Sequence, residues 1–381
     1  MNYDFTDKEF TLFIDIHTLI SQWAKENNLE SSDADLSEQQ IRQALGQLSK
    51  TAYLTLAMEK SGKSDEYNGL LTLMGAMEVI GAISPSLLLS VETSTRIFGR
   101  ILSTWGSDAQ KADLLAPLID GQLIGAVGLS EDAMNVENDA LMTTGTIDGD
   151  VATVSGQKQY VINAPMADWF AVAGTVDGKN ALFLVQKDTP GLSIGKKVAT
   201  MGYQGAAISK IMLSECKIPA TQVIYPQKAE QLLGTLKLWE NQVLIGASLG
   251  LMKAAFESAR DYAKTHKTGG KPIIAYQKIG FKLSEMLTLF QTSQLFAYKA
   301  AWSADANPKD IESLTLCAKV FCTEAAEQVT AKAMRILGGA GFVSGNTVEQ
   351  SFRCAEYGLF AGTSTEISRV KIGDNALGAM K

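Results

Sequence analysis

The sequence predicts an α+β protein with three successive regions. These are an N-terminal helical domain over residues 1–121, a middle antiparallel β-barrel or β-sandwich domain over 122–225, and a C-terminal four-helix bundle over 226–381. Apolar residues recur at helical spacing in the first region, short β-type runs follow in the second, and long helical periods return in the third. Because strands and helices are grouped rather than alternating, the order excludes a Rossmann arrangement.

The first region shows apolar residues three and four positions apart, as in Leu12, Ile16 and Leu19. Its most apolar stretch covers 70–90, where a charged residue and Pro85 interrupt the run. A membrane-spanning helix needs about 20 uninterrupted apolar residues. We therefore expect a buried helix with a break near Pro85 and no membrane span.

The second region contains short runs rich in β-branched and aromatic residues, separated by Gly, Asp and Pro turns. The runs are VATVSG at 151–156, DWFAVAG at 168–174, ALFLVQ at 181–186 and KIMLSE at 210–215. This spacing predicts a small antiparallel sheet.

The third region predicts long helices over about 230–264, 275–305 and 309–337. The segment Gly338-Gly339-Ala340-Gly341 follows the last of these helices and lacks the G-x-G-x-x-G spacing of a dinucleotide fingerprint. Taken alone, it is compatible either with a helix stop or with a close backbone approach to a ligand.

Composition narrows the classes of function. The chain has 381 residues, 46% of them hydrophobic, and a net charge of −7 without a basic stripe, so nucleic acid is not an expected partner. Its four cysteines lack metal-ligand spacing, and its two histidines, His17 and His266, have no partners for a zinc or triad site. With a polar, acidic N-terminus, the expected location is the cytoplasm.

Glu240 is out of place on an apolar helical stripe. Its helical neighbours include Leu236, Val243 and Leu244, so we expect its carboxyl to be partly desolvated. Desolvation raises the pKa of a carboxyl group and makes it a better proton acceptor near neutrality. The alternative is an ion pair with Lys237 at the helix edge.

Glu92 presents a weaker case of the same kind. Arg96 follows one helical turn later, and an i,i+4 surface ion pair explains the two residues adequately. Arg96 and Arg100 also share a helix face and could together meet an anionic group.

Several segments, in the right order along most of the chain, resemble the acyl-CoA dehydrogenase family. They are WGSDAQKADLL at Trp105–Leu115, GQLIGAVGLSED at Gly121–Asp132, GQKQYVINAPMADWFAVAG at Gly156–Gly174, MGYQGAAISKIMLSECKIPA at Met201–Ala220, THKTGGKPIIAYQ at Thr265–Gln277, ILGGAGF at 336–342 and RCAEYGLFAGTSTEI at 353–367.

The resemblance implies a flavoenzyme that holds FAD and oxidises the Cα–Cβ bond of an acyl-CoA thioester. A carboxylate would remove the α-proton while the β-hydrogen leaves as hydride to flavin N5. Electrons would pass to an electron-transfer flavoprotein, and a homotetramer is implied because the cofactor site borrows a neighbour's loop. A branched, cyclic or dicarboxylic acyl group is the expected substrate.

Site residues follow from matching positions to the family pattern. The implied cofactor contacts are Leu129, Ser130, Tyr160 and Ile162 at the flavin, Thr268 and Gln277 from a neighbouring subunit, Gly338, Gly339 and Gly341 at the dinucleotide, and Thr363 or Ser364 at the pyrophosphate. The implied substrate contacts are Glu92, Arg96, Asn241, Ala361 and Gly362.

The position of the base is the decisive test of the resemblance. Most of the family places Glu immediately before Gly-Thr, but this chain has Ala361 there, or Gly362 in a gapless alignment. A branch resembling isovaleryl-CoA dehydrogenases uses an acid on the first long C-terminal helix, and that position is Glu240. Two independent lines therefore select Glu240 as the catalytic base.

The chain also departs from the family pattern. The T-E-P-x-x-G-S-D turn is replaced by residues 130–137, with its serine lost, and Ile162 stands where a hydroxyl usually lies near the flavin. Three functions thus stay open: a dehydrogenase, an acyl-CoA oxidase or flavin monooxygenase on the same scaffold, and a catalytically silent relative that acts as a binding or assembly partner.

Overall fold

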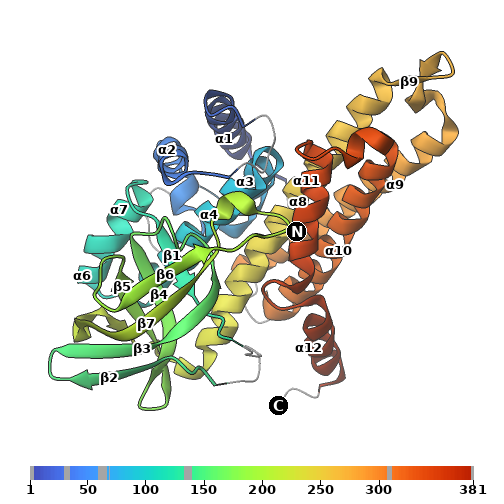
Figure 1. Cartoon of the computed structure of the whole chain (residues 1–381). Helices are drawn as coiled ribbons and strands as arrows, with labels where there is room; N and C mark the ends of the chain where they lie inside the picture. Colours follow the sequence, from blue (N-terminus) through green and yellow to red (C-terminus); the bar gives the residue numbers. More distant parts are fainter. Residues whose placement is uncertain are drawn as a thin grey trace.

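The computed structural model describes residues 4–29, 35–58, 67, 69–132, 140–306 and 311–378. Three layers follow the chain: helices first, then a sheet, then long helices (Figure 1). The transition to strands falls between Ile119 and Gly125, and the return to helix between Ile224 and Leu232. The predicted α+β class is confirmed, whereas the domain limits at 121 and 225 stay predictions.

Short helices that pack around an apolar core form the N-terminal layer. They are α1 (Asp7–Glu26), α2 (Glu38–Leu48), α3 (Gly69–Ile83), α4 (Pro85–Glu92), α5 (Arg100–Trp105), α6 (Asp108–Gln110) and α7 (Ala116–Ile119), with π-helical turns η2 (Thr93–Gly99) and η3 (Lys111–Leu115). The expected break at Pro85 is confirmed, because Ser84 caps α4 and Pro85 occupies its first turn. No described helix is long and apolar enough to cross a membrane.

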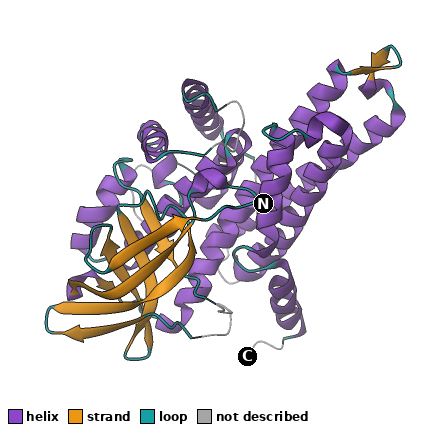
Figure 2. Cartoon of the chain, in the orientation of Figure 1, coloured by secondary structure: helices purple, strands orange, loops and turns teal. Residues whose placement is uncertain are grey.

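The middle layer is a sheet in which eight described strands take part (Figure 2). The strands are β1 (Gly125–Gly128), β2 (Thr144–Asp148), β3 (Val151–Val161), β4 (Trp169–Val176), β5 (Lys179–Gln186), β6 (Leu192–Lys197), β7 (Ser209–Pro219) and β8 (Val223–Ile224). Their order is β6-β7-β3-β2-β4-β5-β8, with β1 beside β4. The predicted antiparallel sheet needs one correction, since β4 pairs in parallel with both β1 and β2.

The C-terminal layer is a bundle of long helices. Its elements are α8 (Leu232–Thr265), the small hairpin β9 (Lys267–Thr268) and β10 (Lys271–Pro272), α9 (Gln277–Ala306), α10 (Ile311–Leu337), α11 (Thr347–Phe360) and α12 (Thr365–Leu377). Helix α10 packs against α8, α9 and α11, which confirms the predicted bundle. Helix α8 runs from the edge of the sheet to the tip that carries β9 (Figure 1).

Two glycines allow α8 to pack closely against α3 of the N-terminal layer. A Cβ added to Gly250 of α8 would lie 2.6 Å from the carbonyl carbon of Gly81 in α3, so the two helices meet backbone to backbone. Such an approach is possible only without side chains. This contact fixes α8, and with it Glu240, relative to α3 and α4.

Asn163 joins the sheet to the N-terminal layer. It is fully buried, and its amide donates to the carbonyl oxygens of Ser90 and Gly125 at 2.8 and 3.2 Å. The hydroxyl of Ser90 donates to its Oδ1 at 2.6 Å. Because buried polar groups must be paired, this satisfied cluster holds β1 and the end of β3 against α4.

Candidate functional site

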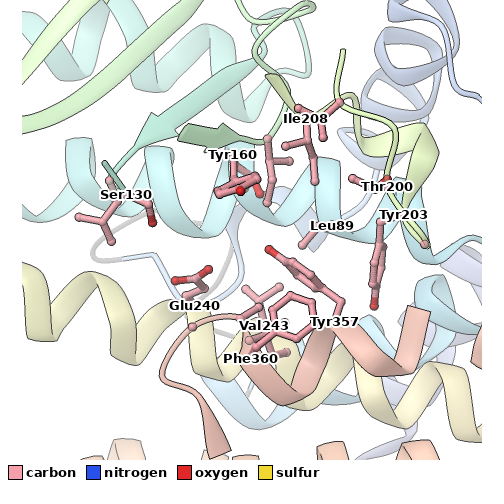
Figure 3. Close-up of a pocket in the computed structure, with 18 of the residues that line it drawn as sticks. Leu89, Ser130, Tyr160, Thr200, Tyr203, Ile208, Glu240, Val243, Tyr357 and Phe360 are labelled. Carbon is pink, nitrogen blue, oxygen red and sulfur yellow. The ribbon is translucent and has the colours of Figure 1, made fainter. Parts of the chain in front are cut away.

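A cavity of about 600 Å³ lies where the three layers meet (Figure 3). Its lining combines segments from the strands, from α4 and η2, from α8, and from α11 with the turn that follows it. Ligand pockets of proteins are typically 300–1,000 Å³ and mainly apolar with a few placed polar groups. The cavity fits that description and is the candidate active site.

One wall of the cavity is aliphatic. Leu89, Thr93 and Ile97 project from successive turns of α4 and η2, and α8 contributes further aliphatic residues. Thr93 is buried, and its hydroxyl is a polar group on a wall that is otherwise apolar. The π-helical turn begins at Thr93; such turns are frequent at functional sites.

Glu240 enters the cavity from α8 together with Leu236, Val243 and Leu244. Figure 3 shows its carboxylate on the same side of the cavity as Tyr357 and below Tyr160. Its side chain is 32% exposed and 3.7 Å from the ammonium of Lys237. Glu240 is therefore half-buried rather than fully buried, and the expected pairing with Lys237 is present as well.

Tyr357 of α11 also lines the cavity. Its pKa is raised, first by burial and then by the nearby charge of Glu240. Its ring makes edge contacts with Tyr203 and Phe360, at centroid distances of 5.3 and 5.6 Å. These contacts hold a neutral phenol beside the carboxylate.

The turn after α11 is tied to α8 beside Glu240. Asn241 accepts a hydrogen bond from the Thr363 amide at 2.9 Å and donates to the Thr363 hydroxyl at 3.1 Å. Gly362 has a φ of +63°, and a Cβ there would lie 2.4 Å from the Asn241 oxygen. The polar groups of Asn241 and Thr363 are thus hydrogen-bonded to each other, whereas Ala361 and Gly362 line the cavity.

The β-sheet side of the cavity presents Leu129, Ser130, Tyr160 and Ile162. Tyr160 is 68% exposed and has a φ of +53°, a conformation that costs free energy for a residue with a side chain. Leu129 and Ile162 contribute aliphatic side chains to the same cavity lining. This surface suits a planar, apolar ring system.

A buried ion pair between Lys158 and Glu131 is bonded to the segment that carries Leu129 and Ser130. The ammonium of Lys158 donates to Glu131 at 2.6 Å and to the Leu129 carbonyl at 3.2 Å. Burial acts to raise the pKa of Glu131, but hydrogen bonds from Lys158, Thr143 and the Met142 amide outweigh it and lower the pKa. The segment carrying Leu129 and Ser130 is therefore held in place.

Glu92 and Arg96 require a correction. The expected surface pair is instead fully buried, with 0% and 1% of the side chains exposed and 3.5 Å between Arg96 Nε and Glu92 Oε2. Tyr53 donates to Glu92 at 2.7 Å, and Arg96 donates to the carbonyl oxygens of Tyr53 and Leu54. Burial raises the pKa of Glu92, and the Arg96 charge opposes that shift. Neither residue lines the cavity.

Arg100 does not line the cavity either. Its guanidinium lies 4.5 Å from the ring centroid of Trp239 and donates to Gln242 at 3.0 Å. The idea that Arg96 and Arg100 together meet an anionic group therefore finds no support in the geometry.

Several of the implied cofactor contacts do not line the cavity of this chain. Thr268 is exposed in the hairpin at the tip of the long helices, where Gln277 begins α9. The residues Gly338, Gly339 and Gly341 form a 3₁₀ turn after α10, which also fits the helix-stop interpretation. Ser364 caps α12. These cofactor roles stay predictions.

The sequence did not single out several lining residues. Tyr203, with a φ of +56°, and Tyr357 come from segments whose local pattern carries no chemical signal, and Thr93 resembles any threonine in a helix. Residues 133–137 of the altered turn lie outside the described residues. Within the described part of the chain, no group of three or more His, Cys, Asp or Glu side chains is placed to hold a metal ion.

Comparison with known proteins gives a consistent result. The model "Acyl-CoA dehydrogenase, middle domain" matches residues 126–216, and "Acyl-CoA dehydrogenase, C-terminal domain" matches residues 237–377. The bovine mitochondrial short-chain specific acyl-CoA dehydrogenase is 31% identical over 87% of this chain and 81% of that protein. A probable acyl-CoA dehydrogenase of Bacillus subtilis, YngJ, is 30% identical over 79% of this chain and 81% of that protein.

Among solved structures, butyryl-CoA dehydrogenase from Megasphaera elsdenii has the same fold. It superposes with a TM-score of 0.90 at 23% identity, and the match covers 99% of this chain and 100% of that one.

Proposed function

The chain belongs to the acyl-CoA dehydrogenase family, and on that premise we propose that it desaturates the Cα–Cβ bond of an acyl-CoA thioester with Glu240 as the base. It is an oxidoreductase, and its cofactor is FAD. The observation that carries the proposal is the position of Glu240. It is a half-buried carboxylate that faces an apolar cavity, while the usual position of the acid is occupied by Ala361.

The surface formed by Leu129, Ser130, Tyr160 and Ile162 fits the isoalloxazine of FAD. The ring of Tyr160 is open to the cavity, and a planar aromatic ligand would cover it and the aliphatic side chains around it. When bound, FAD supplies the two-electron acceptor for the hydrogen that leaves Cβ as hydride.

The protein contributes the base and the placement of the substrate. The Glu240 carboxylate takes the α-proton, which is acidified by the thioester carbonyl, and becomes a carboxylic acid. The C–H electron pair released at Cα forms the new double bond as the β-hydrogen departs. The aliphatic wall of Leu89, Ile97 and Val243 holds the acyl chain across this step and excludes water.

The charges around the cavity favour a neutral acyl group. Of the branched, cyclic and dicarboxylic classes, a distal carboxylate would need an available cation at the aliphatic wall. Lys237 and Arg353 line the cavity, but each already has a carboxylate partner: Lys237 lies 3.7 Å from Glu240 and donates to the Gly362 carbonyl at 2.6 Å, and Arg353 pairs with Glu349 at 2.7 Å. We therefore assign a neutral branched or cyclic acyl chain to the site.

The physiological partners belong to the same proposal. An electron-transfer flavoprotein would accept the electrons, and a homotetramer would bring Thr268 and Gln277 of one subunit to the cofactor of another. In support of assembly, the turn after α10 exposes Phe342 and Val343, which are 87% and 63% accessible. Large exposed apolar side chains of this kind commonly mark protein interfaces.

The absorption spectrum of the purified protein tests the function. We expect a flavin spectrum that is bleached anaerobically by neutral branched or cyclic acyl-CoA thioesters, and more slowly by dicarboxylic ones. Rapid reoxidation of the reduced flavin by oxygen would identify an oxidase or monooxygenase instead. A flavin that no thioester bleaches would contradict the proposal and leave a catalytically silent relative.

A further inference from the structure

Helix α8 contains two lysine–carboxylate pairs with the same spacing and the same separation. Lys237 and Glu240 are three residues apart with 3.7 Å between Nζ and Oε2, and Asp261 and Lys264 are three residues apart with 3.7 Å between Nζ and Oδ1. Their surroundings differ. The side chains of the second pair are 60% and 55% exposed, whereas Lys237 is 12% exposed. The two pairs share a geometry and differ in burial.

Lys237 contacts two parts of the site at once. Its ammonium donates to the carbonyl oxygen of Gly362 at 2.6 Å, in the turn that follows α11. The same ammonium lies beside the carboxylate of Glu240. A lysine ammonium has three donors, so a single group can serve the carbonyl and the carboxylate together.

Partial burial makes this contact stronger than a surface pair. The interaction of two charges grows as the effective dielectric constant falls, and an exposed pair contributes little because water screens it. In addition, the bond to Gly362 restrains the lysine, so less side-chain entropy is lost when the carboxylate approaches.

We propose that Lys237 is a positioning residue that couples the turn of Ala361, Gly362 and Thr363 to the carboxylate of Glu240 and holds that carboxylate in its place at the cavity. The inference rests on the proposed function, because it assumes that Glu240 is the base. In most of the family the acid lies in the turn that here contains Ala361 and Gly362. Through Lys237, that same turn would hold Glu240, the acid on α8, in place.

Other charged and titratable groups also face Glu240. Lys319 of α10 is fully buried, its Nζ is 3.5 Å from the Leu359 carbonyl, and it interacts electrostatically with Glu240 and with Glu366 of α12. Tyr357 approaches from α11. Among these described groups, Lys237 is the one with contacts to both the Gly362 carbonyl and the carboxylate.

The test uses the FAD-loaded full-length enzyme and the acyl-CoA that bleaches the wild type fastest. For Lys237→Met we expect the bleaching rate at saturating thioester to fall about 10- to 100-fold, as for a misplaced catalytic group. The half-saturating thioester concentration should stay within about threefold, because ground-state binding is not the target.

Two further variants make the result decisive. Lys237→Gln keeps a donor for the Gly362 carbonyl without the charge, so flavin content should be normal while the bleaching rate falls as in Lys237→Met. Lys264→Met removes the matched exposed lysine and should leave the bleaching rate and the half-saturating thioester concentration within about twofold of the wild type.

A wild-type bleaching rate in Lys237→Gln would overturn the positioning role. A change in thioester affinity alone would do the same, because it would make Lys237 a binding residue. The proposed function is judged separately by whether the wild type bleaches at all, so the failure of one idea is distinguishable from the failure of the other.

Discussion

Glu92 and Glu240 occupy comparable sequence environments and opposite structural ones. Each lies on an apolar helical stripe with a basic residue within one turn. In the folded chain Glu92 is completely buried between Tyr53 and Arg96, whereas Glu240 is 32% exposed and faces the cavity. The first carboxylate is occupied by internal partners, and the second is accessible to a ligand.

The difference comes from distant segments rather than from local pattern. Tyr53 lies 39 residues before Glu92 and closes the network with its hydroxyl. Around Glu240, the sheet and the turn after α11 leave a cavity. An acid on an apolar stripe therefore indicates an unusual environment, and only the fold decides whether the acid belongs to a buried ion pair or lines a cavity.

The largest expected effect is that of Glu240→Gln. This change removes the proton acceptor and keeps its shape, so bleaching by acyl-CoA should slow about 10²- to 10⁴-fold while the flavin spectrum and stability persist. Adding Ala361→Glu in the same protein should recover part of the rate, because the acid returns to its usual place in the family. Bleaching that is unchanged in Glu240→Gln would remove Glu240 from the mechanism.

Glu92→Gln should reduce stability and leave the bleaching rate nearly unchanged, the opposite of the result expected for Glu240→Gln. It leaves the buried guanidinium of Arg96 without a counter-charge, and breaking such a pair typically destabilises a protein by about 3–5 kcal/mol. Urea unfolding should show this loss, while the bleaching rate per bound flavin stays within about threefold of the wild type. Glu257→Gln, at an exposed position of α8, is the control. A stable but inactive variant would place Glu92 in the catalytic machinery.

The contribution of Lys319 to the free energy of unfolding should depend on pH. Burial lowers its pKa in the folded state to about 8, below the value of about 10.4 for an unfolded lysine. The folded state then binds fewer protons than the unfolded state between these values. The stability that is linked to the lowered pKa of Lys319 is fully present above the unfolded pKa, and it is lost as the pH falls through about 8.

Unfolding measurements at several pH values test this assignment. Between pH 8 and 10.5, the free energy of unfolding of the wild type should rise relative to Lys319→Met by at most about 3 kcal/mol. Parallel pH dependences in the two proteins would show that Lys319 is not the group responsible.

Much of the fold was readable in the sequence, because helical and strand periodicities and the break at Pro85 are local signals. The resemblance selected Glu240, Tyr160 and Ala361, and all three line the cavity. The parallel pairing of β1 with β4 was not readable, since strand order depends on contacts between remote segments. The burial of Arg96 was missed for the same reason, because the carbonyl oxygens that accept its hydrogen bonds belong to Tyr53 and Leu54.

The close backbone contact between Gly81 and Gly250 has a consequence for Glu240, the proposed base. Glu240 lies ten residues before Gly250 on one continuous helix, a span of about 15 Å at the usual rise. Because both residues lie on this one helix, a displacement of α8 at Gly250 also displaces Glu240. A methyl group added at Gly250 would push α8 away from α3 and shift the Glu240 carboxylate relative to the cavity, although the added atom lies about three helical turns from it.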